Sequence, residues 1–157
     1  PLHPEGFFLS KIISHGGFMK RREAREQAFI LAFEQTINND SIQHIIDAAG
    51  MSRDLIADEF AEKLAQGVED HREELDEIIS QYIRGWKMNR LSKTALTILR
   101  MAVYEIRFEK DIPAQVSANE AVELAKKYGA SEDAAFINGV LASVIRAENG
   151  EESHEQP

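Results

Sequence analysis

Apolar side chains recur at spacings of three and four residues along almost the whole of this 157-residue chain. That period places them on one face of an α-helix, whereas a half-buried strand needs strict alternation of apolar and polar residues. The β-branched residues fall within the helical pattern, and no segment carries a strand signal. The spacing therefore predicts an all-α fold of about seven helices.

Capping residues and breaks in the period divide the chain after Met19 into seven expected helices. The first covers 20–37, the second ends at Gly50 in a left-handed cap, the third is capped by Ser52, and the fourth stops near Gly85. The fifth is capped by Ser92 and ends at Asp111–Pro113, the sixth opens with the capping box Ser117–Glu120 and closes at Gly129, and the seventh runs from Ser131 to about Arg146.

The two ends of the chain differ from the rest. Residues 1–18 are expected to be an N-terminal extension, residues 19–147 a single helical domain, and residues 148–157 an acidic disordered tail. The sequence contains no cysteine, which suits a reducing compartment, and no apolar run of the roughly 20 residues that a membrane span requires. These features predict a cytoplasmic protein.

The formal net charge of −9 argues at first against nucleic acid as a ligand, but the charge is unevenly distributed. Residues 1–33 have a net charge of +2, residues 34–85 of −9, residues 86–147 of +2, and the tail of −4. Because the acidic groups are concentrated in the middle and the tail, a local basic surface elsewhere stays compatible with the sequence.

Motifs that bind phosphate or metal are missing from the sequence. It contains neither GxxxxGK nor GxGxxG, and its five histidines form no i,i+4 pair and no HExxH. Glu73 and Glu74 are typical of a solvated helix face. A Ser-His-Asp site is left open by the residues alone, although Gly-x-Ser-x-Gly is absent. We therefore expect no catalytic residues, no metal and no cofactor.

The most basic segment lies at the start of the first expected helix. Lys20, Arg21, Arg22 and Arg25, called the basic cluster below, fall within two turns, so their side chains share one side of the helix. Cations at a helix N-terminus oppose the macrodipole, whereas the backbone N–H groups there favour phosphate. The cluster is thus either an RNA backbone clamp or a solvated face paired with Glu23 and Glu26, and the residues alone do not choose between these.

A second pattern follows the fifth expected helix, where polar residues stand four, three, four and three positions apart. Glu105 lies beside this row, and a tyrosine among arginines suits base stacking or a protein contact. A wet face with a partly covered tyrosine fits equally well. Trp86 is expected to fill a seam between helices. The members of the row are Lys93, Thr97, Arg100, Tyr104 and Arg107.

Five segments, taken in order, resemble the NusB family of transcription antitermination factors. They are Arg22–Glu26, then Trp86 with Arg90-Leu91, Ile98–Ile106, Asn119–Lys126, and Phe136–Leu141, and the resemblance extends from about Lys20 to Arg146. Each segment alone is a weak signal, whereas the ordered set is specific.

The resemblance implies two packed three-helix bundles without catalytic activity. It also implies binding of single-stranded boxA-type leader RNA of ribosomal RNA operons, jointly with the small-subunit ribosomal protein that doubles as NusE, within the RNA polymerase antitermination complex. By the same resemblance Lys20, Arg21, Arg22 and Arg25 are RNA contacts, and the partner-facing residues are Arg100, Tyr104, Glu105, Glu132 and Asp133.

The chain departs from the family pattern at Ala95-Leu96, where many members carry an Asp-Arg pair. The more apolar flank is compatible with a homodimer contact. Two further functions stay open: an RNA-binding module related to the N-terminal domain of rRNA methyltransferases, and a structural helical oligomer. For the partner surface, we expect Glu105→Lys and Glu132→Lys to weaken complex formation without unfolding the protein.

Overall fold

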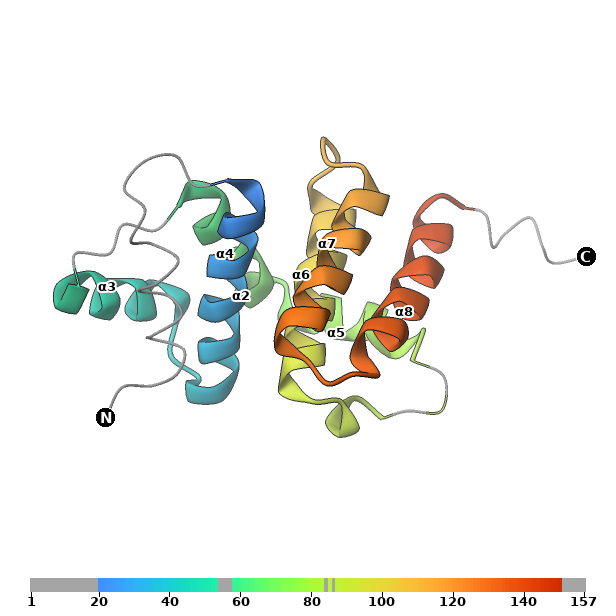
Figure 1. Cartoon of the computed structure of the whole chain (residues 1–157), viewed down its shortest axis with the longest axis horizontal. Helices are drawn as coiled ribbons and strands as arrows, with labels where there is room; N and C mark the ends of the chain where they lie inside the picture. Colours follow the sequence, from blue (N-terminus) through green and yellow to red (C-terminus); the bar gives the residue numbers. More distant parts are fainter. Residues whose placement is uncertain (1–19, 54–57, 84, 86, 151–157) are drawn as a thin grey trace, which may run out of the picture. The chain divides into compact units, whose positions relative to one another are not determined.

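The computed structural model describes residues 20–53, 58–83, 85 and 87–150. Over these residues the chain forms seven α-helices and one short 3₁₀ helix, without a strand. The predicted all-α fold is therefore confirmed. The helices gather into two compact units, and the division falls between Asp70 and His71 (Figure 1).

The first unit is a bundle of three helices, α2 (Arg21–Asn38), α3 (Ile42–Arg53) and α4 (Glu59–Asp70). Each helix contacts the other two, and the contact between α2 and α4 is the most extensive. Apolar residues spaced by three and four positions on α2 and α4 meet in this contact, as their period predicts. The side chains that are completely or almost completely buried include Ala28, Leu31, Ile42, Ala61 and Leu64.

Helix ends in the first unit follow the sequence signals only in part. α2 ends at Asn38, one residue beyond the expected end, and its C-cap is Asn39, whose φ of 59° lies in the left-handed region and whose N–H donates to the Gln35 carbonyl at 2.9 Å. Gly50 does not end α3, which continues to Arg53. Ser52 is likewise not the cap of α4, because Asp58 Oδ1 accepts from the N–H groups of Phe60 and Ala61.

The second unit contains α5 (Arg72–Ser80), η1 (Met88–Arg90), α6 (Lys93–Phe108), α7 (Ala114–Tyr128) and α8 (Asp133–Glu148). It thus has four α-helices, one more than the expected three-helix bundle. α6 contacts each of the other three α-helices, and α7 and α8 pack closely on each other. The central position of α6 explains why most of its residues are buried. Buried apolar residues of this unit include Leu75, Ile79, Ile98, Leu99, Ile137 and Leu141.

Among the predicted helix ends in this unit, those at Ser92 and Gly129 are confirmed, whereas those at Ser117 and Ser131 are wrong. Ser92 Oγ caps α6 by accepting from the Ala95 N–H at 3.0 Å, and Gly129 closes α7. α7 begins at Ala114, so Ser117 lies inside the helix and its hydroxyl donates to Glu105 Oε1. Ser131 does not cap α8 either, since the N-cap residue is Glu132 and no side chain accepts a capping hydrogen bond there. The Ser131 hydroxyl donates to Glu132 Oε2.

Several sequence predictions fall outside the described residues. Residues 1–18, Trp86 and residues 151–157 are among the positions for which no structure is described. α8 ends at Glu148, the residue at which the acidic tail was expected to begin. The proposed domain limits therefore stay predictions.

Candidate nucleic-acid interface

The basic cluster occupies the first two turns of α2. Lys20 is the N-cap residue, with an extended backbone (φ −66°, ψ 153°), and its carbonyl accepts from the Ala24 N–H at 2.9 Å. The Lys20 side chain makes no capping hydrogen bond. The first N–H groups of a helix lack intrahelical acceptors. At this end of α2 they lie beside positively charged side chains, and both kinds of donor favour an anion.

Two arginines of the cluster converge on an aromatic ring of another helix. The Arg21 guanidinium carbon lies 4.0 Å from the centroid of the Phe60 ring, and that of Arg25 lies 5.4 Å from the same centroid. Both distances are within the range of a cation–π contact. The structure thus brings Arg21 and Arg25 together on the side of α2 that faces α4.

Exposure separates the members of the cluster. Lys20, Arg21 and Arg22 are exposed, whereas only 4% of Arg25 is exposed. Glu23 and Glu26 are partly exposed on the same turns, and Glu23 lies in the first turn, where a carboxylate interacts favourably with the helix dipole. Three of the four cations are therefore exposed, and the fourth is buried.

The start of α4, which carries Phe60, is tied to α2 by buried polar groups. Gln27 of α2 is completely buried, and its Oε1 accepts from the Asp58 N–H at 2.8 Å. Asp58 in turn caps α4 through the N–H groups of Phe60 and Ala61, at 2.9 and 3.1 Å. Phe60 does not belong to the site predicted from sequence, because the spacing of apolar residues by three and four positions places it on the core face of its helix.

The polar row on α6 is buried over its middle three members. Thr97 is completely buried, and Arg100 is 6% exposed. The Arg100 guanidinium donates in bidentate geometry to Asp76 of α5, from Nε to Oδ1 at 2.7 Å and from Nη2 to Oδ2 at 2.8 Å. The interpretation of this row as a wet face is therefore wrong for these residues. Asp76 was not identified from sequence, because its pairing joins two helices.

Tyr104 and Glu105 each contact other residues of the second unit. Tyr104 is 7% exposed, and its ring centroid lies 5.0 Å from that of Phe108 and 5.9 Å from that of His71. Glu105 is 2% exposed and accepts from the Ser117 hydroxyl at 2.9 Å. These contacts assign both residues a packing role, and their predicted contact with a partner stays a prediction.

The acidic turn before α8 contains one exposed and one partly exposed carboxylate, and both accept hydrogen bonds from neighbouring residues. Glu132 is exposed, whereas Asp133 is partly exposed and its Oδ2 accepts from the Ala130 N–H at 2.9 Å. At the departure from the family pattern, Ala95 is 2% exposed and Leu96 is partly exposed. Of the five predicted partner contacts, Glu132 is therefore the most accessible.

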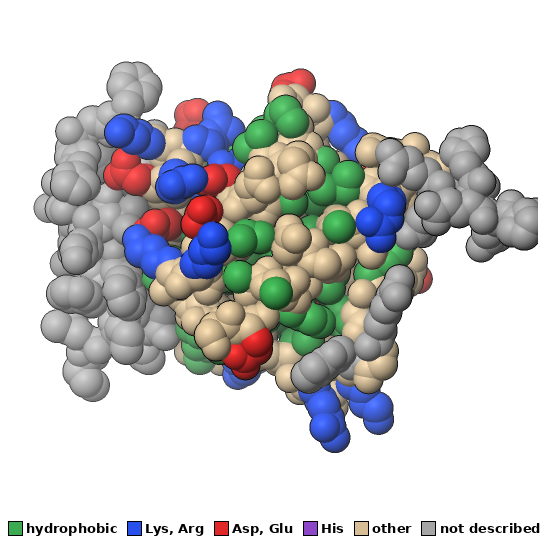
Figure 2. Space-filling model, turned by 45° about the vertical axis from the view of Figure 1, so that its right-hand side comes forward, with side chains coloured by type: hydrophobic (Ala, Val, Ile, Leu, Met, Phe, Trp, Pro, Cys, Tyr) green, Lys and Arg blue, Asp and Glu red, His purple; other side chains and the backbone are tan. Residues whose placement is uncertain are grey.

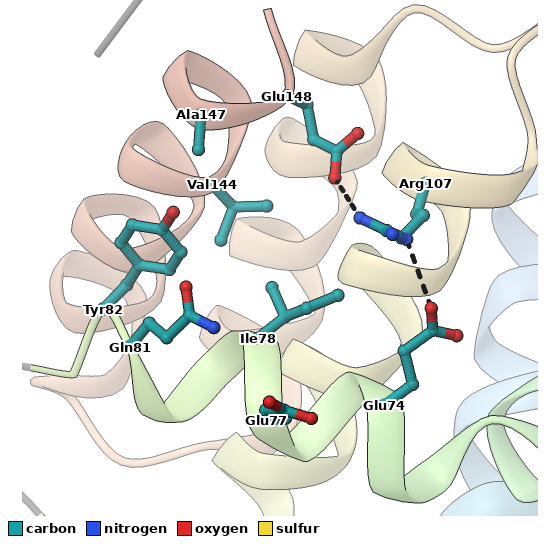
Figure 3. A pocket seen from close by; sticks show the side chains of 9 residues that line it. All are labelled: Glu74, Glu77, Ile78, Gln81, Tyr82, Arg107, Val144, Ala147 and Glu148. Carbon is teal, nitrogen blue, oxygen red and sulfur yellow. Dashed lines mark hydrogen bonds and ion pairs between the residues drawn. The ribbon is translucent and has the colours of Figure 1, made fainter. Parts of the chain in front are cut away.

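A groove of about 380 Å³ lies between α5, α6 and α8 in the second unit (Figure 3). Arg107 Nη1 lies 2.9 Å from Glu148 Oε1, and Arg107 Nε lies 3.5 Å from Glu74 Oε1, so one guanidinium bridges carboxylates from two helices. Ile78 and Val144 lie beside this bridge (Figure 3). The arrangement gives Glu74 a structural partner and agrees with its interpretation as a helix-surface residue.

Charged side chains of both signs lie next to one another on parts of the molecular face drawn in Figure 2.

Within the described residues, no three His, Asp or Glu side chains form a group that could hold a metal ion. None of the helices that these residues form is both long and apolar enough to cross a membrane.

Solved structures share this architecture. T. maritima NusB is 31% identical, with a TM-score of 0.72, and the match covers 87% of this chain and 98% of that one. The matching chain in a crystal structure of the antitermination factors NusB and NusE in complex with dsRNA is 26% identical, with a TM-score of 0.71, and the match covers 81% of this chain and 96% of that one.

Sequence relatives agree with the structural ones. The Transcription antitermination protein NusB of Clostridium novyi (strain NT) is 43% identical over 133 residues, which covers 82% of this chain and 100% of that protein. The protein of the same name from Bacillus velezensis is 43% identical over 130 residues, which covers 80% and 95%. A family model described as the NusB family matches residues 22–146. The chain belongs to the NusB family.

Proposed function

We propose that this protein is a transcription antitermination factor that binds RNA through the basic cluster at the start of α2. The observation that carries the proposal is the placement of three exposed cations, Lys20, Arg21 and Arg22, at a helix N-terminus in a chain of the NusB family. The ligand is single-stranded leader RNA of the boxA type from ribosomal RNA operons. The protein acts as a cytoplasmic adaptor and performs no catalysis.

The chemistry of the cluster suits a phosphate backbone. Guanidinium groups donate several N–H bonds to phosphate oxygens, and each cation that neutralises a phosphate releases counterions. Binding therefore weakens as salt rises, by roughly 0.7 logarithmic units per decade of salt for each contact with a single strand. Bases that stay unpaired in a single strand are free to meet nearby side chains or backbone groups.

The protein partner in this proposal is the small-subunit ribosomal protein that acts as NusE. A structural neighbour contains NusB and NusE together with dsRNA, which supports the assignment. Exposed Glu132, at the turn before α8, supplies a carboxylate for a basic partner protein. Opposite charges at the rim of an interface raise the rate of association more than the final affinity.

Coverage of the relatives favours this function over the methyltransferase-related module. The match with the Clostridium novyi relative spans the whole of that protein, whose name describes transcription antitermination.

The test is equilibrium binding of fluorescently labelled RNA over a series of salt concentrations. Leader RNA of the boxA type is compared as a single strand and as a duplex, and with a scrambled single strand, each with and without the ribosomal protein. We expect the single-stranded leader RNA to bind most tightly and the ribosomal protein to strengthen that binding. Tighter binding of the duplex would contradict the proposed RNA form.

The location of the site is tested with a matched pair of variants. Arg21→Ala with Arg22→Ala removes two charges from the basic cluster, whereas Lys110→Ala with Lys126→Ala removes two from exposed positions of the second unit. Both double variants change the net charge equally. Loss of RNA affinity only in the first supports the cluster, and equal losses show that binding follows net charge.

A further inference from the structure

We infer that Phe60 is a positioning residue of the RNA site, because its ring holds the Arg21 guanidinium in place before RNA binds. The inference rests on the proposed function, since it assigns a role within the same basic cluster. Phe60 comes from α4, whereas the cluster lies on α2. The RNA site therefore needs two helices of the first unit rather than one.

The geometry places Phe60 beneath the two arginines of α2 that are one turn apart. Arg21 Cζ lies 4.0 Å from the ring centroid, which is a close cation–π contact, and Arg25 Cζ lies 5.4 Å away. Phe60 is partly exposed, and Arg21 itself is exposed. The ring thus holds a guanidinium at the surface, where the N–H donors of that group stay accessible to phosphate.

The ring itself is held by polar contacts at the start of α4. The Asp58 carboxylate accepts hydrogen bonds from the N–H groups of Phe60 and Ala61. The side chain of buried Gln27 of α2 accepts a hydrogen bond from the Asp58 N–H. These bonds fix the first turn of α4 relative to the helix that carries Arg21. The position of the ring is therefore set by the fold.

Pre-ordering of Arg21 should strengthen RNA binding. A free arginine side chain has many rotamers, and fixing them at an interface lowers affinity. A guanidinium that already lies on an aromatic face loses less freedom on binding a phosphate. From the strength of exposed cation–π contacts, we expect the ring to raise RNA affinity by roughly two- to fivefold.

A double-mutant cycle between Phe60 and Arg21 tests the inference. Phe60→Leu keeps a large apolar side chain and removes the aromatic face. We expect this variant to weaken binding of single-stranded leader RNA by roughly two- to fivefold. The salt dependence should stay unchanged, because every phosphate contact remains. Arg21→Ala should weaken binding and also make the salt dependence shallower. In the Arg21→Ala background, Phe60→Leu should have no further effect.

Further variants separate positioning from folding. Phe60→Trp replaces the ring with a stronger cation–π partner, so this variant should bind RNA at least as well as the original protein. Phe33→Leu removes another partly exposed ring of the same unit, one that stacks on Phe29 with centroids 5.6 Å apart, and should leave RNA affinity unchanged. Circular dichroism and thermal unfolding of each variant report the folded fraction.

The possible outcomes are distinct. The inference is overturned if Phe60→Leu weakens RNA binding equally with and without Arg21, since the ring then acts independently, for example by stacking on a base. It is also overturned, with the proposed function intact, if Arg21→Ala weakens binding and Phe60→Leu does not, or if Phe60→Trp loses as much affinity as Phe60→Leu. If Arg21→Ala has no effect on RNA binding, both this inference and the proposed RNA role of Arg21 fail.

Discussion

The cations of the basic cluster differ in their access to solvent, and this difference predicts different effects on replacing them. Arg22 is exposed, whereas Arg25 is 4% exposed and its guanidinium carbon lies 5.4 Å from the centroid of the Phe60 ring. We expect Arg22→Ala to reduce RNA affinity and to make the log–log salt slope shallower by roughly 0.7. The thermal stability of this variant should stay the same or rise slightly, because the substitution removes a positive charge from the positive end of the helix dipole.

Arg25→Ala should instead lower stability. Its buried stem packs against neighbouring side chains, so its removal should reduce the free energy of unfolding by about 1 kcal/mol. Urea unfolding of Arg22→Ala and Arg25→Ala, beside an RNA titration of each, separates these effects. Equal stability of the two variants would show that the buried stem of Arg25 contributes nothing to packing.

Burial also revises the expectation for the two glutamates. Glu105 is 2% exposed and bonded to Ser117, so Glu105→Lys should lower the free energy of unfolding by roughly 2–4 kcal/mol rather than leave the fold intact. Glu132 is exposed, and Glu132→Lys should slow association with the ribosomal protein while the fold is retained. Calorimetry with that partner, together with thermal unfolding, gives both readouts. Retained stability in Glu105→Lys would contradict the first expectation, and unchanged partner binding by Glu132→Lys the second.

At the scale of helices, two serines predicted as caps provide a direct comparison. Ser92 caps α6, whereas Ser131 bonds to the neighbouring Glu132 side chain. Ser92→Ala should therefore reduce the free energy of unfolding by about 1 kcal/mol, and Ser131→Ala by much less. Denaturant unfolding of the two variants is the measurement. Similar losses would indicate that Ser131 also stabilises its helix.

Local sequence signals identify helix interiors better than helix starts, and particular residues show why. The apolar period of α6 and the cap at Ser92 are properties of adjacent residues, and both were predicted. The start of α4 depends on Gln27, which lies 31 positions before Asp58. The Ser117 hydroxyl likewise donates to Glu105, which belongs to the preceding helix. A pairing between helices leaves no trace in the local pattern.

The candidate site shows the same limit. The basic cluster could be predicted from the sequence because its four members lie within six consecutive residues of one helix. Phe60 could be assigned to the apolar face of its helix, but its contact with Arg21 depends on how α4 packs on α2. In the same way, the burial of Arg100 depends on Asp76, which belongs to α5.

At the scale of the whole molecule, the proposed function requires a protein of net charge −9 to bind RNA through a small basic area. The acidic remainder repels RNA during approach, and this repulsion extends farther at low salt. Glu73 and Glu77 are exposed on α5 and belong to the most acidic part of the sequence. We expect Glu73→Gln with Glu77→Gln to raise the association rate for leader RNA at low salt, with little change in the dissociation rate.

Stopped-flow mixing of labelled RNA at two ionic strengths measures both rates. The matched control is Gln43→Ala with Gln66→Ala, which alters two other side chains of the molecule without changing its net charge. A faster dissociation rate in the glutamate variant would indicate that these residues touch the bound RNA. An unchanged association rate at low salt would show that the acidic remainder does not influence the approach.

The bidentate pair between Arg100 and Asp76 also constrains how this sequence can change over generations. Loss of Asp76 leaves the Arg100 charge, whose side chain is 8% exposed, without its counterpart, whereas loss of Arg100 leaves an Asp76 side chain that is 30% exposed. A single replacement is therefore disfavoured at both positions, and more strongly at Asp76. A paired replacement by apolar residues of similar size removes both charges together and is tolerated far better. The two positions, on separate helices, are therefore expected to mutate jointly, and descendants of this sequence should carry either both charges or neither.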